Sequence, residues 1–455
     1  MTPLLALLVG YSLALIVVGL WIGRRVQRST TFFVGDRSLG AGLVFATFLA
    51  PNIGAGSTVG ATAFAYHQGL AAWWWSGSAG LGSLVLAFFV GPRIWREATR
   101  LKLLTVGDFL EHHFGRGVRG LAALIIWMGS LLILCAQLDG VAAVLNIAGG
   151  LSHTAGALIG AAVMTAYFVA GGLTSAARVN SIQLFVKLAG FAIATPLVVA
   201  AAGGWDATMA AGPAGASFWR GSDATSGWPR LLLLGPAFFL SPALLQKAFA
   251  ARDERALTTG VALNGVALMA FAIVPVLLGL AARTLHPALA DADVALTVLT
   301  SVPLVIGGLA LAAVFSAELS AADAVLFMLS TSASQDLYRS FVRPSASDAD
   351  LLRVARWAAF AGGCVGFALT FVYPAVLDAL TVFYSVLVVS LFAPILGGLY
   401  LPRAGRWGAL AAMLIGITTL AVTSLSTGGA GYGWAAPYFL GLVASGLTYL
   451  VFALL

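Results

Sequence analysis

The side chains that could do chemistry in this sequence are ionisable and polar groups inside long apolar stretches. The densest group is Ser316 to Asp323, SAELSAAD, which holds two acids within six residues. Ala317, Ser320 and Ala321 would share one face of a helix, whereas Glu318 would point nearly opposite. A carboxylate inside a membrane is costly to bury and is a functional candidate by default. The chemistry indicated here is the binding of a cation or the transfer of a proton.

Two further apolar stretches carry polar side chains. Gln137 and Asp139 lie close together in one of them, and Asp139 is again an intramembrane carboxylate. Asn180, Gln183 and Lys187 are spaced i, i+3 and i+7, so they share one helical face. A lysine this deep needs a partner, and we expect that face to look into a helix bundle.

Two apolar stretches should be broken helices. In Thr47 to Gly60, TFLAPNIGAGSTVG, Pro51 removes a backbone donor, and Gly54 and Gly56 do not resist unwinding. A second break is predicted in Leu231 to Leu245, LLLLGPAFFLSPALL. The alternative is a proline kink filled by neighbouring helices. Carbonyl groups freed by a break are tolerated in the hydrocarbon core only where they line an enclosed cavity. Transporters bind coupling cations at such carbonyls, so two paired breaks favour a binding site at the membrane midplane.

The composition of the chain indicates that these helices lie in a membrane. Of 455 residues, 60% are hydrophobic and 9% are charged, which excludes a soluble domain and indicates an all-α polytopic membrane protein. At roughly 20 residues for each crossing, about thirteen spans are predicted. They lie at 3–22, 41–66, 71–95, 117–147, 154–173, 179–202, 229–250, 258–283, 294–334, 353–374, 376–401, 407–426 and 434–454.

The positive charges behind the net charge of +7 indicate how the chain is oriented in the membrane. Most Lys and Arg residues, Lys247 among them, fall on one side of the predicted membrane, which is the positive-inside pattern. It predicts a plasma (inner) membrane protein with its N-terminus outside and its C-terminus in the cytoplasm, and no nucleic-acid partner. Trp73, Trp74 and Trp75 are expected to be an interfacial anchor, with a substrate platform as the alternative.

Several classes of function are disfavoured. Residues 1–22 read as a retained helix, because positive charges follow the apolar run instead of preceding it. Cys135 and Cys364 lie inside predicted spans, where they indicate neither a disulfide nor a metal site. No nucleophile motif, phosphate loop or Cys/His cluster indicates an enzyme. The expected partners are a small-molecule substrate and the lipid bilayer, and no obligate protein partner is evident.

The spans fall into two groups of five, each starting with a broken helix, as inverted repeats would. The predicted division is a peripheral N-terminal helix in 1–30, a first repeat in 31–203, an external loop and second repeat in 204–401, and two peripheral helices in 402–455.

Several segments, in order, resemble the sodium:solute symporter family of sugar, proline, pantothenate and sialic-acid transporters. They are FFVGDRSLGAG, LAPNIGAGSTVG, LTVGDFLEHHFGR, YFVAGGLTSAARVNSIQ, QKAFAARDERALTTG, FSAELSAADAVLFMLSTSASQDLYR and LGGLYLPRAGRWGALAAMLIG. The resemblance covers roughly residues 30–425. It implies a LeuT-type core of five plus five helices, preceded by one helix and followed by two, in a secondary transporter that works by alternating access.

The resemblance also implies a Na⁺ site between the spans at 41–66 and 294–334. Its backbone ligands would fall on Ala50, Ile53 and Ala317, and its hydroxyl ligands on Ser320 and the next residue. That residue is Ala321, where relatives usually carry Ser or Thr. The family carboxylate linked to sodium passage or to a second sodium aligns with Asn180.

These departures leave three kinds of coupling open. Asp323 lies near enough along its helix to compensate for the hydroxyl missing at Ala321, which would preserve sodium coupling. A proton carried by Asp323, Glu318 or Asp139 is the second possibility, and uncoupled exchange is the third. A non-transporting sensor is a further alternative, disfavoured because no kinase or receiver segment is present.

The family geometry implies a substrate site between five spans. Its candidate residues are Asn52, Gly56, Ser57, Ser76, Gln137, Asp139, Phe238 and Phe239. Ser57 stands where sugar-transporting relatives have a key glutamine, which favours an amino acid or a monocarboxylate over a sugar.

The last expectation concerns Lys187, the basic side chain deepest inside a predicted span. Glu318 points away from the expected sodium face and needs a different partner. In the family fold their two helices pack beside each other. We therefore predict a buried Lys187–Glu318 ion pair near the position of the missing carboxylate at Asn180.

Overall fold

The computed structural model describes residues 2–23, 29–288, 301–372 and 376–455, and helices make up nearly all of this part of the chain. The β structure found in these ranges consists of isolated bridges only. Among the described residues, 11 helices are long and apolar enough to cross a membrane. The all-α polytopic architecture is therefore confirmed. The count of thirteen is not reproduced, because residues 55–100 form one continuous helical stretch and α3 is short.

The first predicted break is present. Helix α3 (Ala41–Asn52) ends one residue after Pro51, and Ile53 and Gly54 leave the helical conformation, with Gly54 extended. A short 3₁₀ turn, η2 (Ala55–Ser57), then leads into α4 (Val59–Gln68). Pro51 donates no hydrogen bond to the preceding turn, so the helix comes apart at this point and exposes carbonyl oxygens.

The second break lies within the predicted stretch. Helix α11 (Leu231–Leu240) follows the 3₁₀ turn η5 (Trp228–Arg230) and stops at Ser241, whose ψ is 121°. Pro242 then opens α12 (Pro242–Phe249). A residue that precedes proline is pushed out of the helical region, which explains why Ser241 separates the two half-helices.

The rest of the first half runs through helices of unequal length. They are α1 (Pro3–Gly23), α2 (Ser29–Val34), η1 (Gly35–Arg37), η3 (Gly69–Ala72), α5 (Trp73–Val85), the π-helical turn η4 (Leu86–Val90), α6 (Gly91–Arg100), α7 (Val106–Phe114), α8 (Arg116–Gly149), α9 (His153–Ala201) and α10 (Gly204–Ala210).

Helix α9 carries both spans that the sequence predicts between 154 and 202. Residues 156–160 pack in antiparallel order against residues 138–142 of α8. Residues 183–190 pack in antiparallel order against residues 309–316 of α16. Since α8 and α16 are themselves antiparallel, the two parts of α9 run in opposite directions. The link between the two predicted spans, at residues 174–178, lies within α9.

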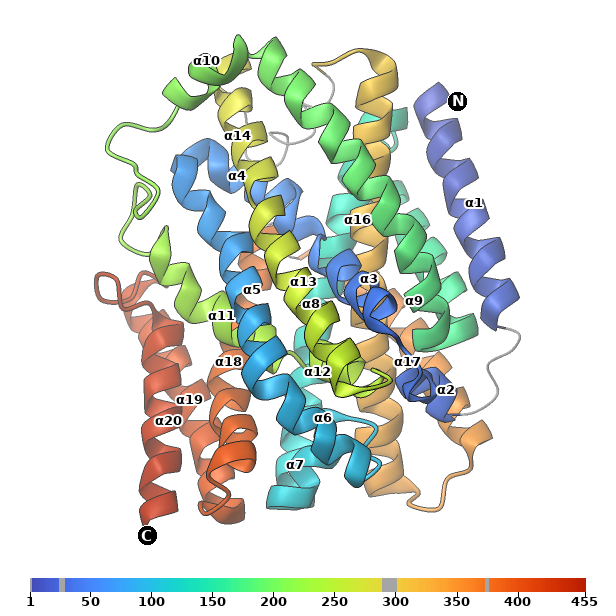
Figure 1. The fold of residues 1–455 in the computed structure, drawn as a ribbon, viewed down its shortest axis with the longest axis vertical. Coiled ribbons are helices and arrows are strands. Elements are labelled where there is room, and N and C mark those ends of the chain that lie inside the picture. The colour runs from blue at the N-terminus through green and yellow to red at the C-terminus, as the bar shows by residue number, and fades with distance from the viewer. Residues whose placement is uncertain (1, 24–28, 289–300, 373–375) are drawn as a thin grey trace.

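The second half is formed by α13 (Glu254–Phe271), α14 (Ile273–Leu285), α16 (Leu304–Thr331), the π-helical segment η7 (Ser332–Val342), α17 (Asp348–Leu369), α18 (Val376–Tyr400), α19 (Gly405–Thr427) and α20 (Pro437–Leu454). The first residues predicted for the span at 294–334 lie outside the described ranges. Figure 1 shows α1 on one flank of the bundle and α19 and α20 on the opposite flank, with the broken helices between them.

A buried arginine ties the lower end of the bundle in Figure 1 together. Arg119 of α8 makes salt bridges to Asp336 of η7 at 2.9 Å, and to Asp108 and Glu111 of α7 at 2.7 Å each. Thr105, which caps α7, donates to the Asp336 carboxylate at 2.6 Å. We call these five residues the Arg119 cluster. It joins α7, α8 and η7 through charge pairs.

Glu111 of this cluster lies outside the membrane-spanning helices. Partial burial opposes its ionisation, but hydrogen bonds from Arg119 and Arg116 and their positive charges outweigh burial. The pKa of the Glu111 carboxyl is therefore below its usual value.

Candidate functional site

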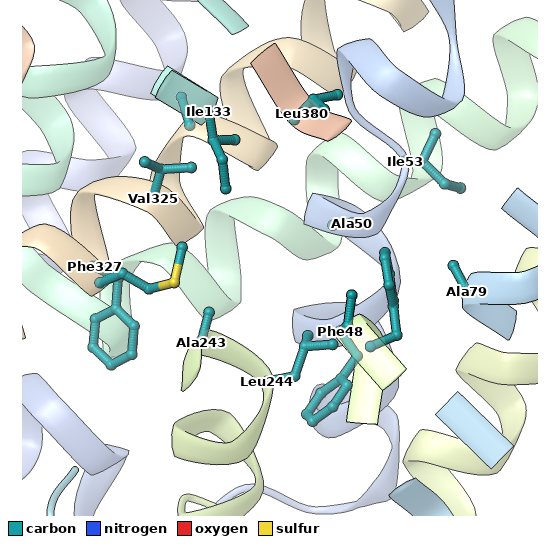
Figure 2. Close-up of a cluster of buried hydrophobic side chains, with 14 of the residues drawn as sticks. Phe48, Ala50, Ile53, Ala79, Ile133, Ala243, Leu244, Val325, Phe327 and Leu380 are labelled. Carbon is teal, nitrogen blue, oxygen red and sulfur yellow. The ribbon is translucent and has the colours of Figure 1, made fainter. Parts of the chain in front are cut away.

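A cavity of about 80 Å³ lies between the two broken helices. Its lining comes from α3, η2, α5, α8, α11, α12, α16 and α18. Most of the wall is apolar, and Figure 2 shows part of it, with side chains from several helices: Ala79, Ile133, Ala243, Leu244, Val325 and Leu380. The volume is well below the roughly 300–1,000 Å³ of drug-sized sites. The cavity therefore suits a compact solute.

Polar groups enter the cavity at the first break. Gln137 of α8 accepts a hydrogen bond from the Ala55 amide at 3.0 Å, which satisfies a donor freed by the unwinding. Ser57 donates to the Asn52 carbonyl at 2.9 Å. Ser76 Oγ is buried and has no hydrogen-bond partner within the described residues. The break thus supplies fixed dipoles, and Ser76 leaves one hydroxyl available to a solute.

Two glycines are required for this close packing. A Cβ on Gly54 would lie 2.5 Å from Cβ of Ala321 and 2.8 Å from Oε1 of Gln137. A Cβ on Gly56 would lie 2.5 Å from Leu380. The unwound segment approaches α8, α16 and α18 closely because these positions lack side chains.

The structure places six of the eight predicted substrate residues in the cavity wall, and their role in binding stays a prediction. These are Asn52, Gly56, Ser57, Ser76, Gln137 and Phe238. Phe239 is outside the lining and its ring packs against Phe392. Asp139 is also outside, because it lies two residues after Gln137 and so points to another side of α8. Its carboxylate meets His153 at 3.1 Å.

The tryptophans of α5 differ from the prediction. Trp74 and Trp75 are buried, and Trp75 lines the cavity. The guanidinium of Arg230 lies 5.6 Å from the Trp75 ring centroid. Trp75 is therefore part of the cavity wall, closer to the platform alternative than to an interfacial anchor. The sequence pattern alone does not distinguish the two, because a Trp run fits both.

The expected cation ligands surround the amine of Lys187. Lys187 Nζ donates hydrogen bonds to Ala50 O, to Ile53 O at 3.2 Å and to Ser320 Oγ at 2.6 Å. Ser320 Oγ in turn lies 2.9 Å from Ala50 O and 3.0 Å from Ala317 O. The structure thus brings together the four residues assigned to the sodium site, with Lys187 Nζ among them. The sequence placed Lys187 on a buried face without identifying these partners.

The oxygen set does not fit an additional sodium ion. A protonated amine has three N–H donors, and the three oxygens bonded to Lys187 Nζ give each donor an acceptor. A second cation about 4 Å away would be repelled by about 4 kcal/mol at an effective dielectric constant of 20. In this structure the Lys187 amine lies among oxygens that the resemblance assigns to a sodium site.

The predicted Lys187–Glu318 ion pair is wrong as a direct contact. Glu318 Oε1 accepts a hydrogen bond from Thr58 Oγ1 at 3.1 Å, whereas Lys187 Nζ donates to Ile53 O at 3.2 Å. The two side chains form no salt bridge in the described part of the chain. The three N–H groups of Lys187 donate to carbonyl and hydroxyl oxygens at the break, which leaves none for a direct ion pair with Glu318.

The polar face of α9 is buried as predicted. Asn180 and Gln183 are 1% and 0% exposed. The Asn180 side-chain oxygen and the Gln183 amide have no hydrogen-bond partner among the described residues. Asn180 brings no charge to the position where the resemblance implies a carboxylate.

Lys247 of α12 is a site residue that the sequence placed on the cytoplasmic side. It is 2% exposed and lines the cavity, and its Nζ donates to Thr47 O at 3.1 Å. Asp323, the predicted auxiliary ligand, is buried in α16 and lies outside the cavity lining. The available signal was distance along the chain: Lys247 lies within two helical turns of the break at Ser241.

Comparisons with known proteins agree with this geometry. The sequence profile of the sodium:solute symporter family matches residues 32–416. The osmoregulated proline transporter of Bacillus subtilis is 22% identical over 90% of this chain and 87% of its own length. The sodium/pantothenate symporter of Escherichia coli is 26% identical over 92% and 89%.

Solved structures share the fold. A Na⁺-coupled sialic acid symporter in a substrate-bound outward-open state matches with a TM-score of 0.83 at 18% identity, over 98% of this chain and 97% of that one. MhsT in complex with L-phenylalanine matches with a TM-score of 0.51 at 15% identity, over 91% of this chain and 97% of that one. The predicted LeuT-type fold is confirmed.

Proposed function

The chain belongs to the sodium:solute symporter family, which makes it a secondary active transporter of small organic solutes, and we propose that its solute is a compact carboxylate. An amino acid or a monocarboxylate fits this description. The solute would occupy the cavity between the two breaks while the repeats move in alternating access.

The observation that carries this proposal is Lys247. Of the charged side chains in the described ranges, it is the one that lines the cavity. Its ammonium makes one hydrogen bond there, to Thr47 O, which leaves two of its three N–H groups for a solute. A carboxylate is the group that an ammonium in an apolar wall binds best.

Neutral groups would hold the remainder of the solute. Ser76 Oγ and the polar groups of Gln137 and Asn52 lie in the same wall as the rings of Trp75 and Phe238. Apolar walls with few polar groups fix the orientation of a small ligand. Ser57 is short, so it adds no amide of the kind that recognises sugar hydroxyls.

We further propose that the lower end of the bundle in Figure 1 faces the cytoplasm across a plasma (inner) membrane, with the N-terminus outside. The basic side chains of α6 and the Arg119 cluster lie at that end, in agreement with the positive-inside rule. Labelling with a membrane-impermeant maleimide in intact cells tests this orientation, with single cysteines introduced at Arg96 and Trp434 in a variant from which Cys135 and Cys364 have been removed. Position 434 should react and position 96 should not.

The test of the solute class is uptake into proteoliposomes that contain the purified protein. Radiolabelled amino acids and monocarboxylates should accumulate in the vesicle lumen, and the matching amides or methyl esters should compete at least about tenfold less well, as expected when a charged hydrogen bond is lost. Equal competition by an acid and its amide would contradict the proposal.

Lys247→Met should lower the apparent affinity for the acid and leave little discrimination against its amide. The matched control is Lys102→Met, since Lys102 is exposed and lies outside the cavity lining. Monodisperse elution of each variant in detergent shows whether it folds. An unchanged preference for acids in a folded Lys247→Met protein would remove Lys247 from the site.

A further inference from the structure

We propose that Lys187 is a built-in cation at the position where the family resemblance places sodium, so that solute transport by this chain needs no sodium ion at that site. The inference depends on the proposed function only because both concern solute transport. Its structural basis is the set of contacts that Lys187 Nζ makes with Ala50, Ile53 and Ser320.

The first argument is the chemistry of the partners. Two of them are main-chain carbonyl oxygens freed by the break, and the third is a hydroxyl. Such oxygens bind coupling cations in transporters with broken helices. They are neutral, so they do not form an ion pair with Lys187. They solvate its charge as ligands solvate an ion.

The second argument is position. Carbonyls at the C-terminal end of α3 carry the negative end of the helix dipole, and Ala50 and Ile53 lie at that end. A positive charge there holds α3 against α16. Lys187 reaches this place from α9 and is 0% exposed, so one side chain bridges the three helices.

The third argument is the sequence around the site. Ala321 has a methyl group where the resemblance implies a hydroxyl ligand, and its Cβ lies close to the backbone of Gly54. Asn180 is neutral where the resemblance implies a carboxylate. A sodium site would lose affinity through both changes, whereas a tethered ammonium that already has three acceptors needs neither group. The same inference therefore explains both departures from the family pattern, at Ala321 and at Asn180.

The first experiment needs no transported solute. Thermal unfolding of the detergent-purified wild-type protein is followed in NaCl and in KCl at equal ionic strength. We expect the same melting temperature in both salts, since a ligand raises it only by binding the folded state. A saturable, sodium-specific rise that Ser320→Ala abolishes would overturn the inference.

The second experiment measures initial uptake with external Na⁺ replaced by N-methyl-D-glucamine. Wild-type uptake should change by less than about twofold, whereas coupling through a bound ion typically gives about 5-fold to 150-fold. Loss of more than about fivefold on sodium removal, together with a sodium-specific rise in melting temperature that Ser320→Ala abolishes, would overturn the inference. Failure to find any carboxylate that is transported would overturn the proposed function instead, and the melting experiment would still decide the role of Lys187.

Variants then make the site accept an ion. Lys187→Ala removes the amine from the oxygens that surround it. The double variant Lys187→Ala with Ala321→Ser also restores the missing hydroxyl. We expect a sodium-specific rise in melting temperature in the double variant, and sodium-dependent uptake. Lys102→Ala is the matched control and should behave as wild type. A folded double variant that gains no sodium response would contradict the assignment of this oxygen set as a cation site.

Discussion

Two buried basic side chains, Arg119 and Lys187, meet different partners. Arg119 is held by three carboxylates at the lower end of the bundle in Figure 1. Lys187 is held at the centre by carbonyl and hydroxyl oxygens. A basic group among acids is one member of a network of fixed charges. A basic group among neutral oxygens is solvated like a free ion, and an ion can replace it.

This difference predicts different responses to substitution. In the Arg119 cluster, loss of one charge leaves a buried partner uncompensated. At Lys187, loss of the ammonium leaves neutral oxygens that water or a small cation can satisfy. The comparison can be tested by four measurements, given in order of decreasing effect.

The largest effect is expected for Arg119→Ala. Asp336 would remain buried without its main partner, and breaking a buried pair in this way costs about 3–5 kcal/mol. The yield of monodisperse protein and its melting temperature should both fall sharply. The control is Arg116→Ala, which removes an exposed partner of Glu111. If Arg119→Ala melted like Arg116→Ala, the cluster would not be a structural tie.

A smaller effect distinguishes direct pairs from distant ones. A double-mutant cycle on Arg119 and Asp336 should give a coupling energy of about 0.5–3 kcal/mol, the range for residues in contact. The same cycle on Lys187 and Glu318 should give less, because those side chains have separate hydrogen-bond partners. Melting of the single and double variants measures both cycles. A larger coupling for Lys187 with Glu318 would reverse the comparison.

Ser320→Ala should have a modest effect on stability. It removes one neutral acceptor from Lys187, and a hydrogen bond of this kind to a charged group is worth about 1.5–3 kcal/mol before water replaces it. We expect a net loss of about 1 kcal/mol, because the carbonyls of Ala50 and Ile53 remain. Chemical or thermal unfolding with Ser330→Ala as the control checks this value. A loss as large as that of Arg119→Ala would contradict the view that Lys187 is solvated by several equivalent oxygens.

The smallest effect is a dependence on pH. The pKa of Glu111 is lowered in the folded protein, so its contribution to stability is fully present above the unfolded pKa and is lost as the pH falls through the folded pKa. Glu111 is partly exposed to solvent, so the contribution should be a few tenths of a kcal/mol, as for surface pairs. The drop in melting temperature on acidification should be smaller in Glu111→Gln than in wild type. Identical acid profiles would show that Glu111 adds nothing to the cluster.

The sequence predicted the fold well because the responsible signals are local. Proline and glycine in an apolar stretch reveal a break wherever they occur, and both breaks are present. Spacing along a helix also revealed the buried face of Asn180, Gln183 and Lys187.

The site was harder to predict because contacts between distant segments decide it. Lys187 meets Ala50 across 137 positions of the chain and Ser320 across 133, and no helical spacing encodes such a meeting. Lys247 was assigned to the cytoplasmic side together with most other basic residues, whereas α12 turns it into the cavity. The family geometry assigned both Gln137 and Asp139 to the cavity, although residues two apart lie on different sides of a helix.

The tether on Lys187 has an energetic consequence. An ion that binds on one side of the membrane and leaves on the other is driven by its gradient and by about 2.3 kcal/mol per 100 mV of potential for each charge. A charge fixed to α9 moves back with the protein in every cycle, so it performs no net transfer. The membrane potential does no work on it over a complete cycle, and no current is carried through that position. The energy for concentrating the solute must then enter at another site of the molecule.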